Sequence, residues 1–135
     1  MRSQTDTYLI ITSFLLATVA YLTGMFRVGI MDIDASLYAE MSREMLKSGD
    51  FLEFRNRIID HYLDKPPLIF WSGAASYAVF GVNEFAYRLP AFLTTLLGAW
   101  SVYRFSRLFY SANASAFAAL ILYTCQAWFL VNHDV

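Results

Sequence analysis

An uncharged run of 19 residues, Tyr8 to Phe26, constrains this chain more than any other feature. About 20 apolar residues in a helix span the hydrocarbon core of a bilayer, so the run is long enough to cross a membrane once. It is not followed by the Ala-x-Ala cleavage site of a secretory signal. We therefore expect an uncleaved membrane helix, which we assign to residues 7–26.

The composition of the whole chain is typical of a membrane protein. Of its 135 residues, 58% are hydrophobic and 16% are charged, whereas about a quarter of a soluble domain is charged. The net charge of −1 provides no basic field, so we expect no nucleic-acid partner. The single Cys125 allows neither a disulfide framework nor a thiolate metal site, and its place in an apolar run predicts a small hydrophobe within a helix.

Three more charge-poor runs follow the first one, at residues 66–83, 89–103 and 108–132. Two of them predict further membrane spans, which we assign to residues 85–104 and 112–131. Arg88 and Arg104 lie near the two ends of the first of these spans. Their long side chains are expected to extend to the lipid headgroups.

The remaining run, after Lys65, leaves two arrangements open. Pro66-Pro67 favours a helix start, Leu68–Phe80 continues the helix, and Gly81 is expected to end it. The small residues at positions 72–76 suit close helix packing in a membrane. If this short helix lies in the membrane interface, the chain crosses the bilayer three times. If it spans the bilayer, there are four crossings.

Most of the polar residues lie in the segment from Arg27 to Lys65, which holds six Lys or Arg and eight Asp or Glu. Within it, Asp34–Lys47 has the periodicity of an amphipathic helix, with Asp34 at the N-cap position and Gly49 as the stop signal. Its two faces are the polar Glu40, Arg43, Glu44 and Lys47 and the apolar Leu37, Tyr38, Met41 and Met45. Such a helix, joined to a membrane span, is expected to lie in the interface.

The sequence thus predicts an all-α polytopic membrane protein with three transmembrane helices, or with four as the alternative. In the three-crossing arrangement, a large first loop, residues 27–84, carries two juxtamembrane interfacial helices. The distribution of basic residues opposes an outward placement of this loop. With three crossings, seven Lys or Arg lie on the side of the loop and the other side has Arg2, Arg104 and Arg107. The positive-inside rule would place the loop in the cytoplasm.

Two places in the loop carry residues suited to chemistry. Asp34 either caps its helix or accepts a proton from an acceptor hydroxyl. Asp64 and Lys65 either begin the next helix or, through the lysine, bind a phosphate at the depth of lipid headgroups. Tyr38 and Tyr62 are interfacial anchors or phosphate contacts. Because the sequence contains no nucleotide-binding loop and no cluster of metal-ligand residues, we expect no cofactor and no metal.

Three segments in a fixed order carry a resemblance to a known family: DASLYAEMSREMLKSGDF, YLDKPPLIFW and FGVNEFAYRLPAFL. Together they resemble the N-terminal part of the GT-C membrane glycosyltransferases, closest to the bacterial aminoarabinose transferase and protein mannosyltransferase-like group. The resemblance covers residues 8–135. It implies an inverting enzyme of the bacterial inner membrane, with its active loop facing outward. Such an enzyme transfers a sugar from a polyprenyl-phosphate carrier to a lipid or protein acceptor.

The resemblance also implies residue roles. The catalytic aspartate of the family falls on Asp34, and its contacts to the lipid phosphate fall on Tyr38, Tyr62 and Lys65. Asp64 matches the acidic residue before that lysine, and Asp134 lies near the position of a second functional aspartate. The family's two juxtamembrane helices fall on residues 34–47 and 66–81, which favours three crossings.

Two departures from the family bear on the substrate. Ala35 stands where many relatives have glutamate, and Leu37 stands where the aminoarabinose branch has a basic residue. The resemblance therefore extends to polyprenyl-phosphate chemistry and not to one particular sugar.

The length of the chain bears on its role, because the resemblance covers only the front of such an enzyme. We expect the chain to be an N-terminal fragment of a larger transferase and to be inactive alone. The alternative is a small non-catalytic membrane subunit or lipid-phosphate-binding protein. A transporter fragment is disfavoured, because the charged residues gather in the loop rather than within the spans.

Overall fold

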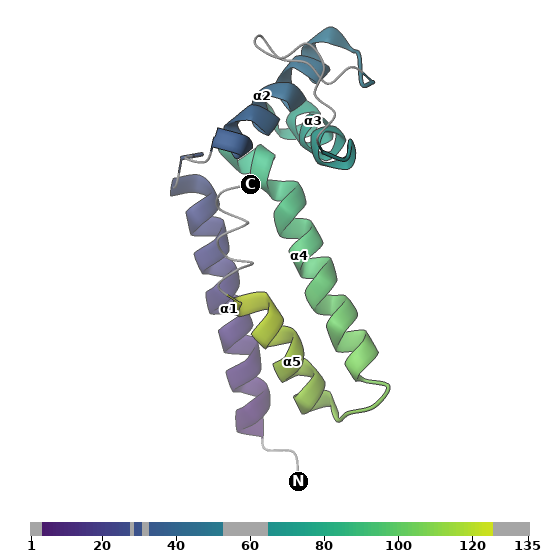
Figure 1. Cartoon of the computed structure of the whole chain (residues 1–135). Coiled ribbons are helices and arrows are strands. Elements are labelled where there is room, and N and C mark those ends of the chain that lie inside the picture. The colour runs from purple at the N-terminus through teal and green to yellow at the C-terminus, as the bar shows by residue number, and fades with distance from the viewer. Residues whose placement is uncertain (1–3, 28, 31–32, 53–64, 126–135) are drawn as a thin grey trace. The chain divides into compact units, whose positions relative to one another are not determined.

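The computed structural model describes residues 4–27, 29–30, 33–52 and 65–125, and over these residues the chain is all-α, as predicted. Its helices are α1 Gln4–Arg27, α2 Ile33–Ser48, α3 Leu68–Phe80, α4 Glu84–Ser106 and α5 Ala112–Thr124 (Figure 1). Their contacts divide the chain into two compact units. Met1–Arg27 and Ala91–Asn132 form the α1–α5 unit, and Val28–Pro90 makes up most of the second, the α2–α3 unit.

Helix α1 is the helix that the uncharged run predicts. Of the described helices, it alone is long and apolar enough to cross a membrane, over Asp6–Arg27. Asp6 in its first turn and Arg27 in its last turn complement the helix dipole. Leu15 and Leu16 are 61% and 66% exposed. Such exposed apolar side chains are what a helix in contact with lipid presents.

Aromatic side chains join α1 to α5 within the α1–α5 unit. The ring of Phe14 stacks on that of Tyr123 with centroids 5.0 Å apart. The Tyr21 hydroxyl donates to the backbone carbonyl of Tyr123 at 2.8 Å, and the Thr18 and Tyr123 hydroxyls lie 3.0 Å apart. Tyr123 is in the last turn of α5, whose carbonyls have no donor within their own helix. Tyr21 therefore caps the end of α5.

Helix α2 has the two faces that its sequence predicts. Its buried residues are Ala35, Tyr38, Met41, Ser42 and Met45. On the polar face, Arg43 Nη2 lies 2.7 Å from Glu40 Oε1, and Lys47 Nζ lies 3.1 Å from Glu44 Oε1. Gly49 ends the helix with φ 73°, and its N–H donates to the Met45 carbonyl at 3.1 Å. This left-handed cap confirms the predicted stop.

Helix α3 begins and ends where Pro66-Pro67 and Gly81 predict. The Trp71 N–H donates to the Pro67 carbonyl at 3.0 Å, and Gly81 leaves the helix with φ 78°. One face of α3 is buried against α2, and the opposite face is apolar but exposed. At the crossing, a Cβ added to Gly73 would lie 2.6 Å from Ser42 Oγ. The small residues therefore permit the close packing that the sequence predicts.

Helix α4 begins at an asparagine cap and contains a proline. Asn83 Oδ1 accepts from the Ala86 N–H at 2.8 Å, as an N-cap residue does. Pro90 lies inside the helix and has no N–H, so it leaves the carbonyl of Ala86 without its usual donor. The hydroxyl of Ser76 in α3 donates to that carbonyl instead. One boundary between the two units falls directly after this proline.

Arg88 is 0% exposed and does not extend to the headgroups, because the first turns of α4 form part of the core of the α2–α3 unit. Arg104 is exposed and lies over the Trp100 ring at 5.6 Å. Cys125 was expected inside a helix, which is wrong. Cys125 is the C-cap of α5. Its backbone N–H donates to the carbonyl of Leu122, three residues earlier, and its side chain is exposed. Residues 126–131 of the predicted third span lie outside the described residues.

Candidate functional site

Helix α2 carries two of the predicted site residues, one turn apart. Because α2 begins at Ile33, Asp34 lies within the first turn rather than at the N-cap, where the helix dipole still favours a carboxylate. The Asp34 side chain is exposed. Tyr38 is 6% exposed, and its ring meets Phe70 edge-on at 5.6 Å. In this structure Tyr38 therefore packs in the α2–α3 core, while Asp34 is presented at the surface.

Lys65 is exposed and stands at the entry to α3. Pro66 and Pro67 follow it, and each ring fixes its own φ near −65°. A residue before proline is also restricted, to extended backbone. The backbone from Lys65 to the start of α3 therefore has few accessible conformations. The other predicted site residues lie outside the described residues, and their roles stay predictions: Tyr62, Asp64 and Asp134.

The junction of α2 and α3 also contains a polar cluster. The sequence pattern predicts its charged residues on α2 but not the tyrosine that α3 adds to them. Arg43 of α2 pairs with Glu40 at 2.7 Å and lies 3.8 Å from Glu44. Tyr77 of α3 is 4% exposed. Burial raises the pKa of Tyr77 to about 12, against the lowering effect of Arg43 and with a further increase from Glu40. Helix periodicity identified the charged residues, whereas the neighbouring tyrosine comes from a different helix.

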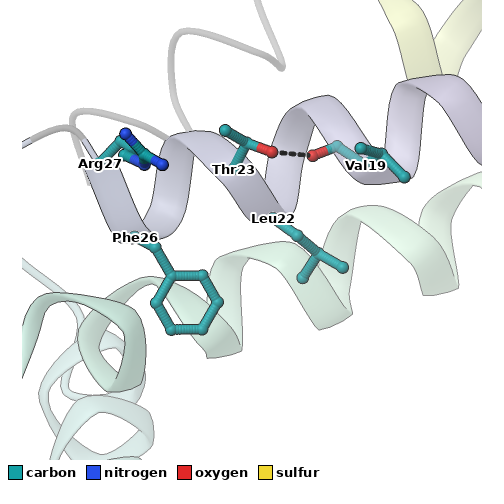
Figure 2. Close-up of a pocket in the computed structure, with 5 residues that line it drawn as sticks. All are labelled: Val19, Leu22, Thr23, Phe26 and Arg27. Carbon is teal, nitrogen blue, oxygen red and sulfur yellow. Dashed lines mark hydrogen bonds between the residues drawn. The ribbon is translucent and has the colours of Figure 1, made fainter.

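A hollow of about 310 Å³ lies along α1, lined by Val19, Leu22, Thr23, Phe26 and Arg27. In Figure 2, Leu22 and Phe26 extend to one side of the helix. The Thr23 hydroxyl turns back to the Val19 carbonyl at 2.7 Å. None of the predicted site residues lines this hollow. Its apolar walls suit the lipid chains that surround a membrane helix, so the candidate site remains the α2–α3 unit.

Comparison with known proteins finds relatives of this chain in both sequence and fold. The family described as dolichyl-phosphate-mannose-protein mannosyltransferase matches residues 64–135. Undecaprenyl phosphate-alpha-4-amino-4-deoxy-L-arabinose arabinosyl transferase 1 from Proteus mirabilis is 29% identical over 126 residues, which cover 90% of this chain and 22% of the relative. The corresponding transferase from Pseudomonas savastanoi pv. phaseolicola is 32% identical over 118 residues, which cover 87% of this chain and 21% of the relative.

A solved structure has a similar fold. The crystal structure of ArnT from Cupriavidus metallidurans in the apo state matches with a TM-score of 0.84 and 30% sequence identity. The match covers 96% of this chain and 24% of that chain, so this chain spans about a quarter of the solved protein. The family match takes in more than half of this chain, and both other comparisons lead to the same group of enzymes. The chain therefore belongs to the dolichyl-phosphate-mannose-protein mannosyltransferase family, and it is similar in sequence and fold to the GT-C aminoarabinose transferases.

Proposed function

We propose that this chain is the N-terminal part of an integral membrane glycosyltransferase that moves a sugar from a polyprenyl-phosphate carrier to a hydroxyl of a lipid or a protein. One observation carries the proposal. In the α2–α3 unit, the exposed carboxylate of Asp34 lies in the first turn of α2, and the exposed ammonium of Lys65 lies before α3. The names of the curated relatives specify an undecaprenyl-phosphate-linked sugar, which supports a donor of this class.

The proposed reaction is an inverting displacement at the anomeric carbon. The acceptor oxygen forms a bond to that carbon while the bond from the carbon to the phosphate oxygen breaks. The leaving polyprenyl phosphate keeps the electron pair, and the acceptor proton passes to the carboxylate of Asp34. The ammonium of Lys65 stabilises the negative charge on the phosphate as it leaves. The two charged groups thus act on opposite sides of the reacting carbon.

Roles for the other predicted site residues follow from the same chemistry. We assign Tyr62 and Asp64, next to Lys65 in the sequence, to the phosphate side of the site. We assign Tyr38 to the support of the phosphate side of the site, because its ring packs on Phe70 in the core of the same unit. Asp134 is assigned to substrate binding.

The arrangement in the membrane that fits this function has three crossings. Helix α3 has 13 residues, a length of about 20 Å at 1.5 Å per residue, whereas the hydrocarbon core is about 30 Å thick. Its exposed face is apolar, with Leu68 and Val79 71% and 74% exposed. A short helix with one face on α2 and one apolar face outward suits the membrane interface. We place the loop on the outer face of the bacterial inner membrane, against the charge count.

The test is Asp34→Asn in the full-length protein, assayed in membranes for transfer from a polyprenyl-phosphate-linked sugar. The carboxamide cannot accept the proton, so transfer is expected to be abolished while membrane insertion and binding of the polyprenyl phosphate persist. Glu84→Gln is the matched control, since Glu84 is also an exposed acid in the first turn of a helix of this unit. It is expected to retain full transfer.

Full activity of the Asp34→Asn protein would contradict the proposal. A protein that binds polyprenyl phosphate through Lys65 but supports no transfer would instead be a non-catalytic lipid-phosphate-binding subunit. That result would show that the carboxylate serves only the N-terminal end of α2. Its replacement would then lower stability by about 0.3–1 kcal/mol, the usual contribution of a negative charge in the first turn of a helix.

A further inference from the structure

One hydrogen bond joins the segment after α2 to the first turns of α3. The indole N–H of Trp71 donates to the backbone carbonyl of Phe51 at 2.8 Å. The two residues are 20 positions apart in the sequence, and the Trp71 side chain is only partly covered, at 41% exposed. The contact therefore links two parts of the α2–α3 unit that the sequence alone does not bring together.

The segment that carries the Phe51 carbonyl is itself held by local bonds. The left-handed turn at Gly49 fixes the direction in which the chain leaves α2. The Asp50 N–H then donates to Ser48 Oγ at 3.2 Å, and the Leu52 N–H donates to Asp50 Oδ1 at 2.9 Å. These side-chain bonds to nearby N–H groups form one turn before Phe51, over residues 48–50, and a second turn over residues 50–52 with Phe51 at its centre. The carbonyl that accepts from Trp71 is therefore a fixed point relative to α2.

The backbone of residues 65–71, which carries the indole donor, is also conformationally restricted. Trp71 belongs to the first turns of α3, and its backbone N–H donates to the Pro67 carbonyl at 3.0 Å. Pro66 and Pro67 have fixed φ angles, and Lys65 precedes them with a restricted backbone. A displacement of Trp71 would therefore be transmitted to Lys65 rather than absorbed between them.

We propose that Trp71 is a positioning residue for Lys65, and that its indole N–H sets where the lysine stands relative to α2. This inference rests on the proposed function, in which Lys65 meets the donor phosphate. Tryptophan at a membrane interface ordinarily acts as an anchor whose N–H bonds to water or headgroups. Here the indole N–H donates to the Phe51 carbonyl instead, so the side chain links two segments of one unit.

The inference is tested by the binding of a short-chain polyprenyl monophosphate to the full-length protein in lipid nanodiscs. Four proteins are compared: wild type, Trp71→Phe, Lys65→Ala and the double variant. Phenylalanine keeps the ring but has no donor, so binding is expected to weaken about fivefold, the effect of one ordinary hydrogen bond. In the Lys65→Ala background, the same change is expected to have no further effect, because Trp71 acts only through the lysine.

Trp100→Phe is the matched control, since Trp100 is an exposed tryptophan of α4 in the α1–α5 unit, and it is expected to bind as wild type does. Gly49→Ala approaches the same link from α2. A Cβ there would meet no atom within 4 Å, but the φ of 73° disfavours alanine. It is expected to weaken binding in the wild-type background and not in the Lys65→Ala background. Helix content by circular dichroism verifies that each variant is folded.

The outcomes separate the inference from the function on which it rests. If Lys65→Ala weakens binding and Trp71→Phe does not, the proposed function stands and the positioning role is overturned. Equal losses from Trp71→Phe with and without Lys65 would also overturn it, because a merely structural effect is additive. If Lys65→Ala binds the phosphate as well as wild type does, the proposed role of the lysine fails, and the positioning role fails with it.

Discussion

The hydroxyl of Ser76 in α3 donates to the backbone carbonyl of Ala86 in α4, the carbonyl that Pro90 leaves without its helical donor. Ser76 is 8% exposed, so little water reaches this contact. A proline within a helix ordinarily leaves a carbonyl unsatisfied and bends the helix. In this chain a neighbouring helix supplies the missing hydrogen bond, and the proline becomes part of the packing of α3 on α4.

Ser76→Ala is predicted to destabilise the protein, because it leaves the buried carbonyl of Ala86 without a donor. The expected cost is about 1–3 kcal/mol, the usual penalty for a buried polar group that loses its partner. Thermal unfolding in detergent would measure it. Pro90→Ala restores an N–H to α4, so Ser76→Ala is expected to cost much less in the Pro90→Ala background. Equal costs in the two backgrounds would contradict this account.

Gly73→Ala is predicted to disturb the crossing of α2 and α3. The added Cβ would lie 2.6 Å from Ser42 Oγ and 3.1 Å from Ser42 Cβ, so the Ser42 side chain or one of the two helices must shift. Overpacking of this kind costs about 1–3 kcal/mol. Gly98→Ala in α4 is the control, because a Cβ there meets nothing within 4 Å and alanine favours a helix. The melting temperature should fall for the first variant and hold or rise for the second.

Tyr21→Phe is predicted to weaken the attachment of α5 to α1. Its hydroxyl caps the Tyr123 carbonyl at 2.8 Å, and Tyr21 is 1% exposed, so its loss should cost about 1–3 kcal/mol. Tyr8→Phe on the same helix is the control, because Tyr8 is 66% exposed. Unfolding midpoints in detergent would compare the two variants. A loss of equal size in both would mean that the buried hydrogen bond contributes nothing specific.

The buried hydroxyl of Tyr77 predicts a loss of stability at alkaline pH. Its pKa is raised from 10.0 to about 12 in the folded protein, chiefly by burial. The unfolded chain therefore loses this proton first, and the stabilisation present below pH 10 declines as the pH rises to about 12. The decline is about 2–3 kcal/mol at 1.36 kcal/mol per pKa unit. Tyr77→Phe should remove this part of the pH dependence in unfolding experiments between pH 9 and pH 12.

The sequence predicts features of this chain that depend on near neighbours. Gly49 and Gly81 mark the ends of α2 and α3, and the prolines before Leu68 mark the start of α3, because each restricts or permits backbone angles locally. The two faces of α2 follow from helix periodicity in the same way. These features can be predicted without knowing which residues distant in the sequence pack against them.

Features that depend on distant partners could not be predicted. The burial of Arg88 and Tyr38 depends on which helix covers each residue, and the bond from Trp71 to Phe51 joins residues far apart in the sequence. For the candidate site, the exposure of Asp34 and Lys65 agrees with their expected roles. Their chemistry stays a prediction, since the assignment came from a resemblance between sequences and not from local geometry.

The division of the chain at Pro90 has a consequence for protein engineering. This boundary between the two units falls within the continuous backbone of α4. Insertion, cleavage or circular permutation at this boundary would break helical hydrogen bonds, so neither unit can be excised cleanly there. The turn between α4 and α5 is a better place for an epitope tag or a reporter, because the residues from Arg107 to Tyr110 are exposed.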